Sequence, residues 1–190
     1  MTTICPVHPW RLRLAANLLR QGGVLAYPTE SVFGLGCNPL DETAVMRLLA
    51  IKRRDPDKGV ILIAGSFEQL KPFVGEIPDD RLAVVQRHWP GPSTWLLPAA
   101  AWVPRWLTGR HTTLAMRVTA HPIAAALCHA AGMPLVSTSA NLSGRPPART
   151  PLQTRIRCGG DLDMVMHGAT GGLSRPTAIH DALTGDTLRE

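Results

Sequence analysis

The sequence has no long apolar run and few cysteines. No segment approaches the roughly 20 consecutive apolar residues that span a bilayer, and the first residues, MTTICPVHPWRLRL, lack the apolar stretch of a secretory signal. We therefore expect a cytoplasmic protein with no membrane association. The four cysteines, at positions 5, 37, 128 and 158, are too far apart in sequence to form a CxxC zinc or redox pair.

Lysine is also scarce, although the chain is basic. The 190 residues carry a formal net charge of +6, and only three of the 20 basic residues are lysine: Lys52, Lys58 and Lys71. A positive net charge makes an anionic partner plausible but does not identify one. Two of the three lysines lie in a single segment, KRRDPDKG (52–59), which makes that segment a candidate for binding an anion.

The common nucleotide and hydrolase motifs are missing. The sequence contains no GxxxxGK[ST] loop, no three-glycine dinucleotide fingerprint, no HExxH and no GxSxG. The histidines at positions 111, 121, 129 and 180 have no metal-ligand spacing, so we predict no zinc site. If a nucleotide binds, it does so through another arrangement.

The residues that are present indicate one folded domain over 1–190. Hydrophobic residues make up 45% and charged residues 18%, which is a globular composition. Periodicity and capping residues predict helices at 9–23, 41–54, 66–74, 79–89, 121–132 and 151–158, and strands at 24–28, 59–64, 93–99, 113–118, 134–141, 163–167 and 177–183. Several strands follow one another without a helix between them, which favours an α/β open sheet of mixed direction.

Three segments carry clusters of polar side chains at the ends of predicted elements. In YPTESVFGLG (27–36), Thr29 and Ser31 follow a strand, where α/β sheets bind ligands. In KRRDPDKG, Lys52 and Arg54 would point about 200° apart on a helix, and they converge only if the helix ends at Asp55. An ordinary capped turn and a solvated helix end are the alternatives.

The third segment, PLVSTSANLSG (134–144), gathers five small polar side chains after an apolar strand: Ser137, Thr138, Ser139, Asn141 and Ser143. Such a run can form an anion-binding turn. The alternative is a hydrogen-bonded Ser/Asn turn, which needs only one or two of these residues.

Two single residues complete the candidate set. Arg117 lies inside the apolar strand LAMRV and needs an anionic partner, which can be a ligand or a structural carboxylate. Thr94 in WPGPST places a hydroxyl at the start of a strand, although turn chemistry explains it equally well.

In this order and spacing, the segments, together with LAMRVTAHP and TAIHDALTG, resemble the YrdC/TsaC family of L-threonylcarbamoyladenylate synthases, in its short form. The resemblance covers nearly the whole chain. It implies a single domain with a twisted open mixed sheet and flanking helices around a deep basic cavity. The family's K-x-R and S-x-N tetrad maps onto four residues that would be catalytic: Lys52, Arg54, Ser139 and Asn141. One departure is Ile63, where longer members have a histidine.

The resemblance also implies the chemistry. L-Threonine, bicarbonate and ATP would give threonylcarbamoyl-AMP and pyrophosphate, for the threonylcarbamoyladenosine modification of tRNA next to the anticodon, and the product would pass to the tRNA threonylcarbamoyltransferase complex. ATP would be bound by Arg54, Lys58, Thr94, Ser139, Asn141 and Ser143, and threonine by Thr29, Ser31, Arg117 and Thr138. Mg²⁺ would be held mainly by phosphates and water, with Glu30 as the nearest carboxylate.

Two other functions remain as alternatives. A non-enzymatic RNA-binding maturation factor would use the same basic cavity. Because the tryptophans do not alternate with arginines as in stacking platforms, we expect tRNA binding, if any, to be weak. A carbamoyl-transfer domain like that of hydrogenase maturation enzymes is less favoured, because the sequence lacks their zinc-finger and acylphosphatase-like parts.

Overall fold

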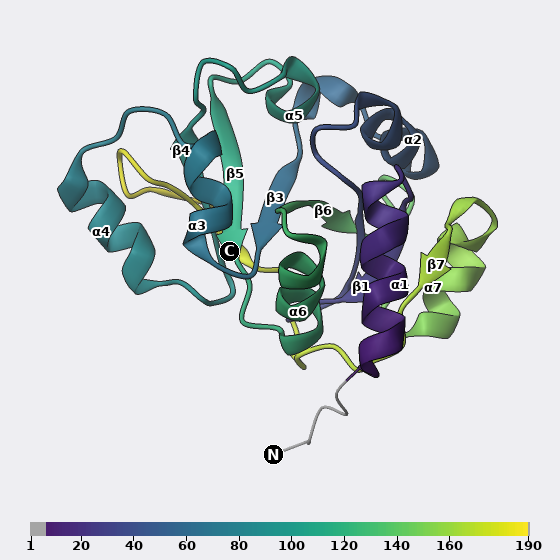
Figure 1. Cartoon of the computed structure of the whole chain (residues 1–190). Helices are drawn as coiled ribbons and strands as arrows, with labels where there is room; N and C mark the ends of the chain where they lie inside the picture. Colours follow the sequence, from purple (N-terminus) through teal and green to yellow (C-terminus); the bar gives the residue numbers. More distant parts are fainter. Residues whose placement is uncertain (1–6, 190) are drawn as a thin grey trace.

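The computed structural model describes residues 7–189 and has at its centre a twisted nine-stranded sheet (Figure 1). The strands are β1 (Leu25–Pro28), β2 (Phe33–Gly36), β3 (Ile61–Ala64), β4 (Ser93–Pro98), β5 (Thr113–Val118), β6 (Leu135–Ser139), β7 (Met164–Val165), β8 (Ala178–Asp181) and β9 (Thr187–Arg189). Their order in the sheet is β7-β1-β2-β6-β3-β5-β4-β8-β9. The sheet contains three parallel pairs (β1–β7, β3–β5, β4–β8), and its other pairs are antiparallel, so the mixed α/β sheet predicted from the sequence is confirmed.

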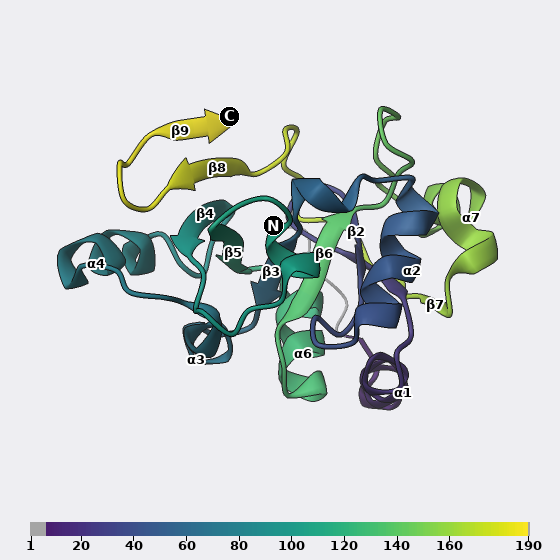
Figure 2. The same ribbon diagram turned by 90° about the horizontal axis from the view of Figure 1, so that it is seen from above.

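Helices flank the sheet. They are α1 (Pro9–Arg20), α2 (Glu42–Lys52), α3 (Phe67–Leu70), α4 (Asp79–Arg87), α5 (Arg105–Thr108), α6 (Pro122–Ala131) and α7 (Pro151–Cys158). In Figure 2, α1, α3 and α6 lie along one side of the sheet, and the β8–β9 hairpin lies on the opposite side. Strands β8 and β9 thus continue the sheet beyond β4 and lie on the side opposite α1 and α6.

The predicted helices and strands are all found, with ends shifted by a few residues, but β2, α5 and β9 were not predicted. Strand β2 has the sequence FGLG, and glycine lowers strand propensity. The strand forms because it pairs on both sides, with β1 and with β6. At Gly36 a Cβ atom would lie 2.6 Å from the carbonyl oxygen of Val136, so the close approach of β2 and β6 requires glycine here.

The apolar core fixes the strand ends that carry the polar segments. Side chains such as Phe33, Leu62, Met116 and Val136 are fully buried. Each lies on a strand that carries hydroxyl or cationic side chains within it, as β5 and β6 do, or just before it, as β2 and β3 do. Within residues 7–189, no helix has the length and apolar character that crossing a membrane would take.

Candidate functional site

A cavity of about 400 Å³ lies between the central strands and the β8–β9 hairpin. Four cationic side chains line it: Arg54, Lys58, Arg117 and Arg189. Eight hydroxyl side chains also line it: Thr29, Ser31, Thr108, Thr113, Ser137, Thr138, Ser139 and Thr177. Within the part of the chain that the structure describes, no aspartate or glutamate belongs to this lining. Four cations without a carboxylate among them make a site for a ligand with several negative charges.

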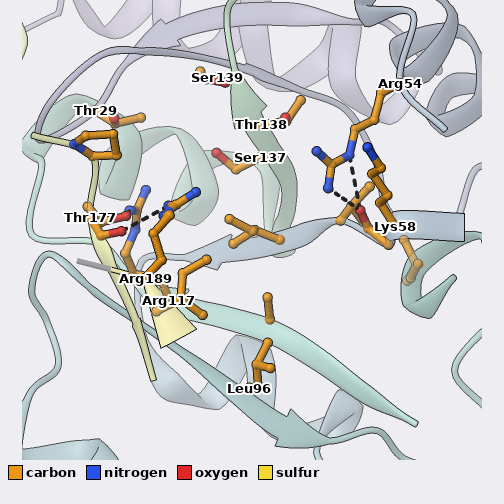
Figure 3. A pocket seen from close by; sticks show the side chains of 18 of the residues that line it. Thr29, Arg54, Lys58, Leu96, Arg117, Ser137, Thr138, Ser139, Thr177 and Arg189 are labelled. Carbon is orange, nitrogen blue, oxygen red and sulfur yellow. Dashed lines mark hydrogen bonds between the residues drawn. The ribbon is translucent and has the colours of Figure 1, made fainter. Parts of the chain in front are cut away.

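The cations fall into two groups, which Figure 3 shows on opposite sides of the cavity. Arg54 and Lys58 lie on one side, and Arg117 and Arg189 lie on the other, beside Thr177. The hydroxyl groups of β6 lie along the wall between them. This arrangement allows two anionic groups of one ligand, or of two ligands, to bind at once.

The end of α2 places Arg54. Helix α2 ends at Lys52, and Arg53 follows in the left-handed conformation with φ 51°. The guanidinium of Arg54 then donates to the carbonyl oxygen of Gly59 through Nε at 3.3 Å and Nη2 at 2.9 Å. Gly59 has φ 60°, which favours glycine. Burial lowers the pKa of Arg54, although the side chain stays charged at neutral pH.

In the second group, Arg117 forms an ion pair with the buried carboxylate of Glu30. Arg117, on β5, donates from Nη1 to the hydroxyl of Thr177 at 2.7 Å, and its Nη2 lies 3.5 Å from Oε2 of Glu30. The other carboxylate oxygen of Glu30 accepts from the Thr119 hydroxyl at 2.6 Å and the Ala120 amide at 3.1 Å. Arg117 is thus held in one orientation before any ligand binds.

Burial and charge act in opposite directions on Glu30. Burial alone would raise its pKa, but the positive charge of Arg117 and the hydrogen bonds from Thr119 and Ala120 outweigh burial and hold the pKa below its ordinary value. The carboxylate is therefore ionised at neutral pH and forms an ion pair with Arg117. Of the two alternatives for Arg117, a ligand anion and a structural carboxylate, the structure contains the carboxylate, and the arginine still lines the cavity.

Lys52 has different surroundings from those predicted. Only 3% of the residue is exposed, and it is not part of the cavity lining. Its Nζ donates to the carbonyl oxygen of Ser139, to the carbonyl oxygen of Asn141 at 2.9 Å and to the side-chain oxygen of Asn141 at 2.9 Å. The helix end separates Lys52 from Arg54, which reaches the cavity, so the two side chains do not converge there.

Some of the other predicted site residues line the cavity, and others do not. Thr29, Ser31, Thr138 and Ser139 line the cavity with Arg54, Lys58 and Arg117. Asn141, Ser143 and Thr94 do not. Ser143 is exposed, and its backbone N–H donates to the carbonyl oxygen of Lys52 at 2.8 Å. Thr94 is fully buried on β4, and its hydroxyl has no hydrogen-bond partner within residues 7–189.

Sequence reasoning missed the contribution of the C-terminal hairpin. Thr177 precedes β8 and Arg189 ends β9, and Arg189 donates from Nη2 to the carbonyl oxygen of Thr177 at 3.0 Å. Burial, then the positive charges of Arg117 and Arg54, lower the pKa of Arg189. Thr177 belongs to the segment TAIHDALTG that was singled out, whereas nothing in the sequence near Arg189 indicated a role.

A resident metal ion does not fit these residues. Over residues 7–189, no group of three or more His, Cys, Asp or Glu side chains could hold a metal. Glu30, the carboxylate nearest to the cavity, is engaged with Arg117, Thr119 and Ala120. Serine and threonine hydroxyls alone are weak ligands for Mg²⁺, which prefers carboxylates, phosphates and water.

Comparison with known proteins gives consistent matches. The model of the Sua5/YciO/YrdC family, described as "Telomere recombination", matches residues 17–190. Two proteins named threonylcarbamoyl-AMP synthase are similar over nearly their full length. The one from Nitrosococcus oceani is 52% identical over 97% of this chain and 99% of its own. The one from Cellvibrio japonicus is 51% identical over 94% of this chain and 95% of its own.

The crystal structure of Sua5 from P. abyssi, in complex with L-threonine, has a similar fold. It superimposes with a TM-score of 0.88 at 36% identity, over 93% of this chain and 52% of that one. The chain thus spans about half the length of that longer protein.

Proposed function

The chain belongs to the Sua5/YciO/YrdC family, and on this premise we propose that it synthesises threonylcarbamoyl-AMP from L-threonine, bicarbonate and ATP, with release of pyrophosphate. It is an enzyme of the nucleotidyltransferase type, and ATP is its substrate. The observation that carries the proposal is the cavity lined by four cations and eight hydroxyl side chains, with no carboxylate from residues 7–189 among them. The relatives that share about half of its sequence, over nearly the whole chain, are named for the same activity.

The charges at the two sides of the cavity favour one orientation of the substrates. Arg54 donates to a neutral carbonyl oxygen, and within residues 7–189 neither Arg54 nor Lys58 forms an ion pair, so most of their positive charge remains available, which suits a triphosphate. Arg117 is paired with Glu30, so less net charge remains there, which suits a single carboxylate. We therefore assign the phosphates of ATP to Arg54, Lys58 and Ser139.

L-Threonine takes the opposite side of the cavity. Arg117 receives its carboxylate, and the hydroxyls of Thr29, Ser31 and Thr138 receive its remaining polar groups. The residues outside the lining, which are Lys52, Asn141, Ser143 and Thr94, receive no direct contact with substrate in this assignment.

The reaction then needs positioning and fixed positive charge rather than a protein nucleophile. The amine of threonine adds to carbon dioxide, formed from bicarbonate, and loses a proton to give a carbamate. A carbamate oxygen attacks the α-phosphorus of ATP, and the bond to the β-phosphate oxygen breaks, so that pyrophosphate leaves. Negative charge accumulates on phosphoryl oxygens, where Arg54 and Lys58 stabilise it.

Mg²⁺ enters this scheme as part of the ATP substrate. Because the residues of the cavity offer no carboxylate cage, the ion would be held by phosphate oxygens and water. The adenylate would be consumed by an enzyme that transfers the threonylcarbamoyl group to tRNA, which is the route expected for the threonylcarbamoyladenosine modification.

The test is incubation with ATP, Mg²⁺, L-threonine and bicarbonate, with mass detection of the adenylate and a separate assay of pyrophosphate. We expect both products only when threonine and bicarbonate are present together. Release of pyrophosphate at the same rate without threonine would rule out the synthase. A protein that binds RNA but forms no adenylate under these conditions would instead support the RNA-binding alternative.

A further inference from the structure

The four tetrad residues differ in what they can touch. Arg54 and Ser139 line the cavity, whereas Lys52 and Asn141 do not. We propose that Lys52 is a positioning residue, whose ammonium group fixes the Ser139–Asn141 turn and thereby sets the wall of the cavity without itself contacting substrate. This inference rests on the proposed function only for the identity of the substrate.

The hydrogen bonds of Lys52 use all of its donors. An ammonium group has three N–H bonds, and Nζ of Lys52 has three acceptors: the carbonyl oxygens of Ser139 and Asn141, and Oδ1 of Asn141. A phosphate oxygen could bind Nζ only if one of these oxygens lost its hydrogen bond from Nζ. Because the group is almost fully buried, that oxygen would gain no water in exchange.

The side chain of Asn141 likewise uses all of its donors and acceptors within the protein. Its Oδ1 accepts from Lys52 and from the hydroxyl of Ser139 at 2.6 Å, and its Nδ2 donates to the carbonyl oxygens of Leu142, at 2.9 Å, and Arg145. Both lone pairs of the amide oxygen and both amide protons are therefore used inside the protein.

The same contacts tie the end of α2 to the loop after β6. The backbone carbonyl of Lys52 accepts from the Ser143 amide at 2.8 Å, while its side chain donates to Ser139 and Asn141. The backbone and the side chain of Lys52 thus both form hydrogen bonds with residues 139–143. Loss of the ammonium group would remove three hydrogen bonds from this turn, leave the carbonyl oxygen of Asn141 without that donor, and release the turn that carries Ser139.

Nuclear magnetic resonance can test this directly, because the chain has only three lysines. With ¹⁵N-labelled lysine, we expect a Lys52 ammonium signal that exchanges slowly with water in the free protein, since the group is buried and fully hydrogen-bonded. Lys58→Met and Lys71→Met assign the other two signals. Pyrophosphate is the probe, and it should shift the Lys58 signal more than the Lys52 signal.

Either of two results would overturn the proposal. One is a Lys52 ammonium group that exchanges as fast as that of Lys71, which is exposed. The other is a pyrophosphate-induced shift at Lys52 as large as that at Lys58. The first readout needs no ligand, so it still decides the question if adenylate synthesis, and with it the proposed function, fails.

A double-mutant cycle gives an independent readout. If Lys52 acts through the turn, Lys52→Met should reduce turnover by about tenfold or more in the native background and by no more than about threefold once Asn141→Ala has already released the turn. Combined with Arg54→Ala, the same change should reduce turnover by its full factor, because Arg54 acts from the cavity. An equal loss in the native and Asn141→Ala backgrounds would contradict the proposal.

Folding is controlled within the same series. Lys52→Arg keeps a positive charge but replaces a compact three-donor ammonium with a planar fork. We expect it to fold with a near-native melting temperature and still to speed amide exchange in residues 139–143 of the free protein. Lys71→Met, at the surface, should leave both turnover and exchange unchanged. Native amide exchange in Lys52→Arg would mean that the ammonium group does not position the turn.

Discussion

Each side of the cavity has a buried cation nearby, and the two cations have different hydrogen-bond partners. At the end of β6, three neutral oxygens surround the ammonium group of Lys52. At the end of β5, the guanidinium of Arg117 faces the carboxylate of Glu30, with 3.5 Å between Nη2 and Oε2. Both residues are almost fully buried, with 3% and 5% of their surface exposed. The first arrangement satisfies hydrogen bonds but leaves the charge uncompensated, whereas the second also cancels most of the charge.

This difference explains how one small cavity can sort two anions. Within residues 7–189, Lys52, Arg54 and Lys58 form no ion pair, although the charge of Asp55 acts on Arg54, so most of the positive charge remains and a polyphosphate is favoured there. Around Arg117, the ion pair with Glu30 lowers the net charge, and a single carboxylate is sufficient to balance it. Keeping an uncompensated charge buried has a cost, which is visible at Lys52: burial, followed by the repulsion of Arg54, lowers its pKa to about 8.

The largest effect should come from removing the cation that reaches the phosphate side. Arg54→Ala should lower turnover by roughly 10²–10³-fold, the range found when a preorganised stabiliser of developing charge is removed. Steady-state kinetics with saturating ATP and threonine would measure it. Arg53→Ala is the matched control, because Arg53 is the adjacent, exposed arginine. If both variants lose the same activity, the loss comes from the helix end and not from the cavity.

The second prediction concerns the carboxylate side. Arg117→Ala should weaken threonine binding by about 1.5–3 kcal/mol, the contribution of a charge-assisted hydrogen bond, and should change ATP binding much less. Calorimetry with each substrate would measure the two affinities, and thermal unfolding would verify the fold, since Glu30 loses its partner. Arg175→Ala is the control for charge, because Arg175 is exposed in the segment before β8. Equal losses for both substrates would remove the distinction between the two sides.

The third prediction uses the pKa of Lys52. Above pH about 8, the amino group loses a proton and can no longer serve three acceptors, so turnover should fall by about tenfold per pH unit. The charged groups near Lys52 are Arg54, which stays protonated, and Cys158, whose thiol has a raised pKa from burial and remains neutral at this pH. In Lys52→Arg the alkaline fall should disappear, whatever its lower plateau. An unchanged alkaline fall in that variant would assign the titration to another group.

The fourth prediction concerns Glu30 and stability in acid. Because the folded-state pKa of Glu30 lies below its ordinary value of 4.5, its ionised form stabilises the fold, fully above that value, and the stabilisation is lost as the pH falls through the folded-state pKa. The melting temperature of the native protein should therefore exceed that of Glu30→Gln by a constant amount near neutrality, and the gap should close on acidification. Threonine affinity in this variant should fall less than in Arg117→Ala. A gap that widens in acid would contradict the ion pair.

The sequence predicted the mixed sheet and most of the elements because their apolar periodicity and caps are local. It also predicted most of the hydroxyl and cationic residues of the cavity, since they lie at strand ends within recognisable segments. It did not predict that Lys52 stays outside the cavity lining to which Arg54 belongs. That outcome depends on Arg53, which adopts a left-handed conformation that no local pattern requires.

The contribution of Arg189 could not be predicted for a related reason. Strand β9 has three exposed residues and pairs with β8. Strand β8 in turn pairs with β4, and the partners Thr94 and Ile179 are 85 positions apart in the chain. Long-range pairing of this kind leaves no signal in a short window of sequence. Thr94 illustrates the converse: a hydroxyl at a strand start is a reasonable candidate by position, but the structure buries it on β4, outside the cavity lining.

The smallest effects should be seen with tRNA, and they separate the cavity from the protein surface. Lys52 and Arg117 are too deeply buried to touch a polynucleotide, so any tRNA binding must use exposed arginines such as Arg155 and Arg157 on α7. Contacts of that kind are made to phosphates. We therefore expect a Kd in roughly the 10⁻⁴–10⁻⁶ M range at physiological salt and a steep loss of binding as salt rises.

Variants of the surface arginines and of the cavity should affect tRNA binding and adenylate synthesis separately. Replacing Arg155 and Arg157 together by alanine should weaken tRNA binding by a few-fold and leave adenylate synthesis unchanged, because both side chains lie outside the cavity lining. Arg117→Ala should do the reverse. Fluorescence anisotropy over a salt series measures the first effect, and the adenylate assay measures the second. If Arg117→Ala abolished tRNA binding, or if binding were tight and insensitive to salt, the cavity would be an RNA site and the distinction between its two sides would not concern ATP and threonine.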